Sequence, residues 1–105
     1  MTNTVTTKSE IISSIKAIQD DIIALGVRSL GLFGSFAKER HNENSDVDIL
    51  VDFLPDQHTF DNFMELAFML EQTLGRPIEL VTRDALSPYI GPHILKEVED
   101  VPLTA

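Results

Sequence analysis

Cysteine is absent from the sequence, basic residues are few, and no long hydrophobic run is present. Without cysteine, disulfide bonds and thiolate metal sites are excluded, which suits a cytoplasmic protein. No apolar run approaches the roughly 18 residues that cross a membrane, and the first residues, MTNTVTTKSE, do not have the pattern of a signal peptide. We therefore expect a cytoplasmic protein without a membrane partner.

The net charge is strongly negative: eight Lys and Arg residues against 17 Asp and Glu residues give −9. Nucleic acid binding depends on basic side chains that displace counterions from phosphates. The charge therefore argues against direct contact with nucleic acid. A metal ion or a cationic protein is a better match for this chain.

The length of 105 residues and a hydrophobic content of 43% predict one globular domain, residues 1–105, with frayed ends over residues 1–6 and 101–105. Hydrophobic periodicity predicts the following elements. They are a helix over Thr7 to Leu25, a strand over Val27 to Phe33, a helical turn over Ser35 to Glu39, a strand over Asp46 to Phe53, a helix from Thr59 to a stop at Gly75, a strand over Ile78 to Thr82, and a helical segment over Asp84 to Asp100. The predicted fold is α/β (α+β): a small mixed sheet with helices on one face and the other face open.

Several side chains away from the strands have structural interpretations. The buried stripe of the helix that starts near Thr59 is predicted to be Phe60, Phe63, Met64, Ala67, Leu70 and Leu74. The histidines show no pairing at metal-ligand spacing and are expected in solvent: His41, His58 and His93. Tyr89 is expected to pack against the protein.

The strand over Asp46 to Phe53 has one apolar and one acidic face, because alternate side chains of a strand point the same way. The apolar face consists of Val47, Ile49, Val51 and Phe53. Asp46 and Asp48 share the other face, with side-chain bases roughly 6.6 Å apart. Carboxylates placed in this way can hold two divalent ions about 3.5–4 Å apart, as in nucleotidyl transfer. Oxygen ligands without cysteine favour Mg²⁺.

Gly34 and Ser35 could supply a phosphate site beside these carboxylates. The 11-residue connection from Gly34 to Asp46 can bring both to one end of the sheet, and the two strands would then be antiparallel neighbours. Glycine lets backbone approach a phosphate, and Ser35 opens a short helix whose free N–H groups attract anions. Glu79 would add a third carboxylate if its strand lies beside the second, to bind a metal or accept a proton from an attacking hydroxyl.

Each of these residues also has an ordinary explanation on its own. Asp46 fits a Ser-Asp turn, Gly34 fits a strand end, and Glu79 fits a solvated strand face. An Asp-x-Asp phosphatase places its pair at the carboxyl end of a strand, whereas the apolar strand here follows the pair. An EF-hand is excluded because Ile49-Leu50-Val51 stands where the calcium loop has polar ligands and glycine.

The stretch GSFAKER…SDVDILVDF, with Gly34-Ser35, the spacer and Asp46-x-Asp48, resembles the signature of DNA-polymerase-beta-like nucleotidyltransferases. With IELVT and IGPHILKEVE downstream, it is similar to the minimal nucleotidyltransferase (MNT) proteins of prokaryotes over most of residues 8–100. The residues that match the family's site are Asp46, Asp48 and Glu79 for catalysis and metal binding, and Gly34, Ser35 and Lys38 for the nucleotide phosphates.

This resemblance implies transfer of AMP from ATP to a hydroxyl acceptor with Mg²⁺, two ions being expected. MNT proteins commonly pair with a HEPN-domain ribonuclease toxin and act as its antitoxin by adenylylating a tyrosine. The alternative within the same fold is an antitoxin that neutralises its partner by contact, without catalysis.

Two departures from the family pattern bear on this site. The family often reads Gly-Ser-x-Ala-Arg-Gly-Glu, whereas here Lys38-Glu39-Arg40 follows Ala37, so only the cation at the first of these positions is kept. The third acid of the family is often aspartate. Glu79 is one methylene longer, which predicts altered geometry at the metal.

Overall fold

A four-stranded mixed sheet forms the centre of the computed structural model, which describes residues 5–42, 44–89 and 91–103. The strands are β1 Val27–Phe33, β2 Val47–Phe53, β3 Ile78–Thr82 and β4 Glu99–Val101, in the order β3-β2-β1-β4. β1 is antiparallel to both β2 and β4, and β2 is parallel to β3. The predicted mixed sheet and the antiparallel pairing of the first two strands are confirmed.

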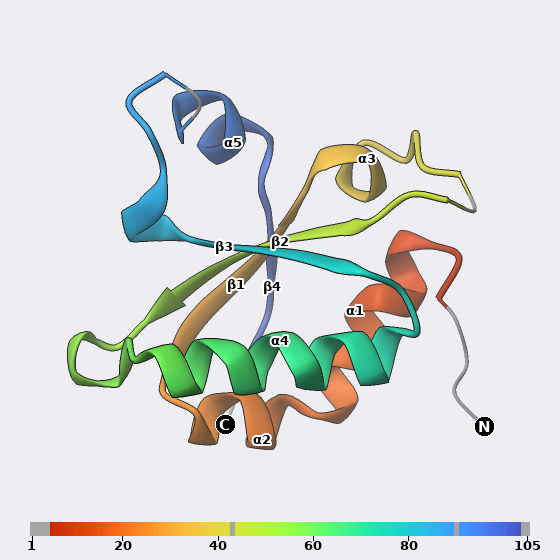
Figure 1. Cartoon of the computed structure of the whole chain (residues 1–105). Helices are drawn as coiled ribbons and strands as arrows, with labels where there is room; N and C mark the ends of the chain where they lie inside the picture. Colours follow the sequence, from red (N-terminus) through yellow and green to blue (C-terminus); the bar gives the residue numbers. More distant parts are fainter. Residues whose placement is uncertain (1–4, 43, 90, 104–105) are drawn as a thin grey trace.

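Helices α1 Lys8–Ala17, α2 Gln19–Ala24 and α4 Phe60–Leu74 lie together on one side of the sheet (Figure 1). The short helices α3 Gly34–Ala37 and α5 Gly91–Glu97 lie toward the opposite side. Single 3-10 turns, Pro55–Gln57 and Arg83–Ala85, follow β2 and β3. In the described ranges no helix has both the length and the apolar character to cross a membrane.

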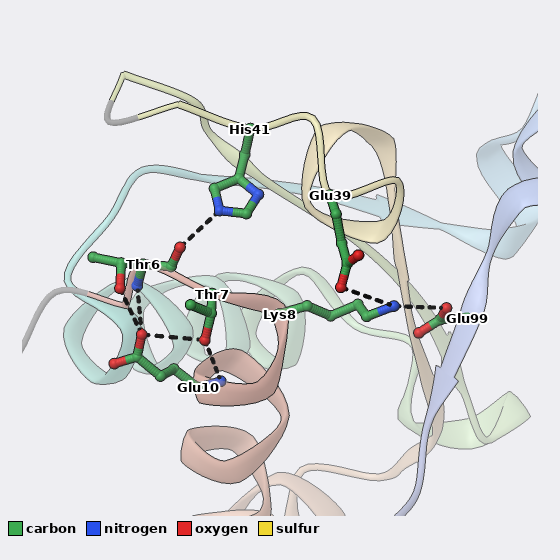
Figure 2. Close-up of polar contacts among 7 residues, drawn as sticks. All are labelled: Thr6, Thr7, Lys8, Glu10, Glu39, His41 and Glu99. Carbon is green, nitrogen blue, oxygen red and sulfur yellow. Dashed lines mark hydrogen bonds and ion pairs between the residues drawn. The ribbon is translucent and has the colours of Figure 1, made fainter.

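The helix predicted over Thr7 to Leu25 is interrupted at Ile18, which has φ −113° and ψ 17°. The predicted start is confirmed: the Thr7 hydroxyl accepts a hydrogen bond from the Glu10 N–H, as an N-cap does. The Glu10 carboxylate in turn accepts from the Thr6 hydroxyl at 2.6 Å (Figure 2). Ile15 and Ile22 are fully buried on either side of the break, so the apolar stripe survives it.

The buried stripe of α4 includes the predicted Leu70 and Leu74 but differs from the prediction at other positions. Leu66, Leu70 and Leu74 are fully buried, whereas Phe60 and Met64 are exposed. Leucines four residues apart follow one line along a helix, and this line contacts the sheet. The periodicity was compatible with more than one choice of face, because apolar residues occupy most of α4.

Of the predicted frayed ends, residues 5, 6 and 101–103 have defined positions, whereas residues 1–4 and 104–105 lie outside the described part of the chain. Val5 is buried, and its N–H donates to the Leu74 carbonyl at 3.0 Å. At the other end β4 pairs with β1, Val101 opposite Leu30, and Val101 is buried. The helical segment predicted over residues 84–100 therefore ends earlier, and a three-residue strand is too short to show a period of its own.

The second face of the sheet is only partly open. Gly31 of β1 and Leu50 of β2, which point away from the α4 side, are both buried. The Val98 side chain lies so close to Gly31 that an added Cβ would overlap it. The C-terminal segment thus covers the middle of this face. The end of the face that carries Asp48 is more exposed.

Candidate active site

Gly34 and Asp48 meet at the end of the β1–β2 pair. Phe33 is the partner of Asp48 in the antiparallel register, so Gly34 follows directly beside it. Gly34 has φ +74°, in the left-handed region that favours glycine, and α3 begins there. A Cβ on Gly34 would overlap the Asp48 carboxylate. The close approach of this backbone to the carboxylate therefore requires glycine.

Asp48 and Glu79 are direct neighbours across the parallel β2–β3 pair. Neighbouring strands lie about 4.8 Å apart, so partner side chains on one face touch. Burial raises the pKa of Asp48 to about 7, helped by a hydrogen bond that its carboxyl donates to Glu79 and by the charges of Glu79 and Asp46. Two carboxyl groups this close disfavour each other's ionised form, and a cation bound between them relieves that repulsion.

Asp46 precedes β2 and is exposed, in a loop that hydrogen bonds hold in shape. The Asn42 N–H donates to the Ser45 hydroxyl at 2.9 Å, and the Ser45 N–H donates to the Asn42 carbonyl at 3.1 Å. The Val47 N–H donates to the Pro77 carbonyl at 3.0 Å, which joins the starts of β2 and β3. This hydrogen bond fixes the backbone next to Asp46 relative to the backbone that leads to Glu79.

Arg76 belongs to this arrangement, although the sequence predicted only a helix stop at Gly75-Arg76-Pro77. The side chain is buried; its Nε donates to the Val5 carbonyl at 2.6 Å and its Nη1 donates to the Ser45 carbonyl at 3.1 Å. Its guanidinium lies over the ring of Phe36 in α3. One side chain thus contacts the segments before Asp46 and after Ser35. A buried arginine among carbonyls has no signal in the sequence.

His41 was predicted to lie in solvent, but it lies against this cluster. Its ring stacks on Phe36, with centroids 3.9 Å apart and planes at 11°. Its Nε2 donates to the Thr6 carbonyl at 2.7 Å (Figure 2). The ring therefore ties the N-terminal segment to the loop after α3.

Three further side chains complete the comparison with the predictions. His58 is exposed, as predicted, although its ring stacks on Phe53 and its Nδ1 lies 3.3 Å from Oδ2 of Asp84. His93 is exposed, as predicted. Tyr89 is exposed, whereas the prediction was that it packs against the protein.

Lys38, a predicted phosphate ligand, is paired with an acidic side chain. Its Nζ lies 2.7 Å from Oε1 of Glu97 in α5, and both side chains are partly exposed. Exposed ion pairs contribute little free energy, about 0–1 kcal/mol, so this one can open. Binding of a phosphate by Lys38 requires that opening.

The chemistry of the donor set fits a divalent cation. Asp48 and Glu79 offer adjacent carboxylate oxygens, which Mg²⁺ prefers and supplements with waters and phosphate oxygens. Among the described residues no three His, Cys, Asp or Glu side chains are grouped as a complete metal site. Mg²⁺ binding by Asp46, Asp48 and Glu79 remains a prediction.

The site combines a Gly-Ser turn, an aspartate beside it on the antiparallel neighbouring strand and a glutamate on the parallel strand beyond. In a mixed sheet backed by helices, this arrangement is typical of the nucleotidyltransferase class of enzymes. Residues 9–101 match the model of the family described as "Nucleotidyltransferase domain", and the chain belongs to this family. The predicted fold and the resemblance to minimal nucleotidyltransferases are thereby confirmed.

Known relatives agree with this assignment. The chain is 42% identical over 73 residues to the protein adenylyltransferase MntA of Thermococcus cleftensis, across 70% of this chain and 73% of that protein. A solved structure provisionally assigned as a minimal nucleotidyltransferase has a TM-score of 0.68 at 27% identity, over 88% of this chain and 95% of that chain.

A more distant structure shares the fold. It is a complex of tri-AMPylated Shewanella oneidensis HEPN toxin with MNT antitoxin, with a TM-score of 0.66 and 21% identity over 93% of this chain and 74% of that chain. At this identity the similarity establishes the architecture alone.

Proposed function

We propose that this protein is an Mg²⁺-dependent protein adenylyltransferase of the cytoplasm. It moves AMP from ATP to a tyrosine hydroxyl of a partner HEPN toxin and so acts as an antitoxin. The observation that carries the proposal is the register that sets Asp48 beside Glu79 and beside Gly34. Family membership and the similarity to MntA support the same reaction.

The proposed reaction is an in-line displacement at the α-phosphorus of ATP. The acceptor oxygen forms a bond to this phosphorus, the bond to the bridging oxygen of the β-phosphate breaks, and pyrophosphate leaves. The proton of the hydroxyl would pass to a carboxylate of the site, a role that we assign to Glu79, the neighbour of Asp48 on β3.

The chain's own groups have distinct roles in this scheme. Asp46, Asp48 and Glu79 would hold Mg²⁺, which when bound neutralises charge on the phosphates. The backbone at Gly34 and Ser35 would contact the phosphates, because no side chain at Gly34 blocks their approach. Lys38 would leave Glu97 to pair with the nucleotide.

Charge favours a protein as the acceptor. A net charge of −9 repels nucleic acid and attracts a partner with a basic surface. A HEPN toxin fits this requirement if it presents its tyrosine near basic side chains.

The test is incubation with labelled ATP, Mg²⁺ and the product of the neighbouring gene. We expect label on the partner with the wild type and at least about a hundredfold less with Asp48→Asn. Asp52→Asn is the matched control, because Asp52 lies on β2 but pairs with Arg28. No transfer by the wild type, or equal transfer by Asp48→Asn, rejects the proposal.

The contact-only alternative is separated by a second measurement. Cells that express the toxin are supplied with the Asp46→Ala/Asp48→Ala double variant. Loss of protection supports the enzyme, whereas full protection assigns the antitoxin effect to binding.

A further inference from the structure

Three large apolar side chains are exposed in one line along α4. Phe60, Met64 and Phe68, the α4 stripe, have exposed fractions of 76%, 48% and 61%. They are spaced at i, i+4 and i+8 and so span roughly 12 Å of one helix face. Scattered exposed apolar residues are ordinary, but an aligned set with two phenylalanines marks an interaction surface.

The α4 stripe is not needed for the core. Leu66, Leu70 and Leu74 of the same helix are fully buried and contribute to the core cluster. α4 lies on one side of the sheet (Figure 1) and shares the core cluster with Ile49 and Val51. Asp48 alternates with these residues along β2 and faces the other side, so the α4 stripe is not on the face that carries Asp48. A partner on this stripe leaves the carboxylates uncovered.

Charge on α4 narrows the choice of occupant. The helix contains no Lys or Arg, and Asp61, Glu65 and Glu71 are exposed along it. Asp61 and Glu65 lie four residues apart, beside the stripe. The surface is therefore an apolar line with an acidic border, and its complement is an apolar line with a basic border.

Other occupants fit this border poorly. Two copies of the chain packed through α4 would bring the carboxylates of Asp61 and Glu65 near their equivalents, and like charges across an interface oppose binding. Helices that lie on membranes carry Lys and Arg toward anionic headgroups, and α4 has neither.

We propose that the α4 stripe docks a basic amphipathic helix of a partner protein. The partner helix places apolar side chains at i, i+3 or i+4 and i+7 against Phe60, Met64 and Phe68, and its Lys or Arg side chains pair with Asp61 and Glu65. The inference does not depend on the proposed catalysis. The contact holds a partner on the face opposite the carboxylates, so docking and chemistry can occur together.

The experiment measures binding of a synthetic helix of about 18 residues, five turns, with a leucine face and a lysine face. A tryptophan in the peptide reports binding by fluorescence, because the protein contains no tryptophan. A second peptide carries glutamate in place of every lysine. The protein variants are Phe60→Ser/Phe68→Ser and, as matched control, Tyr89→Ser, since Tyr89 is 86% exposed but lies outside α4.

The expected results are specific to the stripe. The lysine peptide binds at least tenfold more tightly than the glutamate peptide, and Phe60→Ser/Phe68→Ser weakens it at least tenfold with an unchanged thermal midpoint. Tyr89→Ser binds like the wild type. Equal binding by the double variant overturns the proposal, as does a wild-type dimer in sedimentation that the double variant dissociates.

Discussion

The guanidinium of Arg76 lies 5.1 Å from the centre of the Phe36 ring, while its Nη1 donates to the Ser45 carbonyl. Phe36 follows the Gly-Ser turn by one residue, and Ser45 precedes Asp46 by one. A single buried side chain therefore fixes the spacing between the Gly-Ser turn and the carboxylates. Its own cation is stabilised by carbonyl oxygens and the ring face.

Arg76→Lys is expected to destabilise the fold by about 2 kcal/mol or more. Lysine cannot reproduce the forked donors, so buried carbonyls such as those of Val5 and Ser45 lose partners. The free energy of unfolding is measured with urea, and Arg83→Lys at an exposed position is the control. The KM for ATP should rise more than kcat falls. Unchanged stability and an unchanged KM for ATP would show that Arg76 does not fix the spacing between the Gly-Ser turn and the carboxylates.

Asp48→Asn is expected to fold at least as stably as the wild type while losing activity. The amide removes the repulsion between Asp48 and Glu79, and active sites commonly sacrifice stability for function in this way. Thermal denaturation with and without Mg²⁺ checks this: the midpoint of the wild type rises with Mg²⁺ and that of Asp48→Asn does not. Equal stabilisation of both by Mg²⁺ would contradict binding at Asp48.

Gly34→Ala should reduce activity far more than Gly26→Ala. Both glycines have positive φ, +74° and +84°, so both variants acquire backbone strain of about 1 kcal/mol or more. Only at Gly34 does the new methyl group press on the Asp48 carboxylate. Comparison of label transfer at equal folded concentration isolates the effect on the site. Similar losses for the two variants would mean that strain alone is responsible.

Glu97→Gln is expected to lower the KM for ATP by about two- to threefold, because an exposed ion pair of under 1 kcal/mol no longer competes for Lys38. Lys38→Ala should raise this KM in both backgrounds. Initial rates at varied ATP give the answer. If Glu97→Gln raises the KM for ATP, the ion pair with Glu97 holds Lys38 in the orientation that binds ATP and does not compete with ATP.

The N-cap of α1 predicts a dependence of stability on pH. Hydrogen bonds from Thr6, with smaller ones from Thr7, lower the pKa of Glu10 below its ordinary value of 4.5. The folded chain therefore binds fewer protons there, and this stabilisation is present above pH 4.5 and lost as pH falls through the lower folded pKa. Unfolding midpoints measured over this range should decline less steeply for Glu10→Gln than for wild type. Glu71→Gln, exposed on α4, is expected to follow the wild type.

Short-range patterns made the centre of this fold predictable. The alternation in β2 assigned Asp48 and Ile49 to opposite faces, and the Gly34 to Asp46 spacing predicted the antiparallel pair. Both are local, because one strand and one connection contain them. The placement of Glu79 beside Asp48 was conditional on strand order, which periodicity does not encode and which the β2–β3 pairing supplies.

The features that sequence reasoning missed depend on contacts between distant segments. Arg76 and Val5 are 71 residues apart and share a hydrogen bond, and β4 exists because β1 offers an edge for Val101. His41 looked solvated because its neighbours are polar, yet a ring stack places it. No pattern within one element could indicate these pairings.

The parallel β2–β3 pairing also sets an order of assembly. β1 and β2 are joined by a short connection, so Gly34 and Asp48 can meet early, at small loop-closure cost. Glu79 arrives only after α4 has crossed to the far edge of β2. During synthesis a chain that has emerged only as far as Phe53 holds the turn and two aspartates without its third carboxylate. We therefore expect transfer competence to appear late, once the crossover has closed.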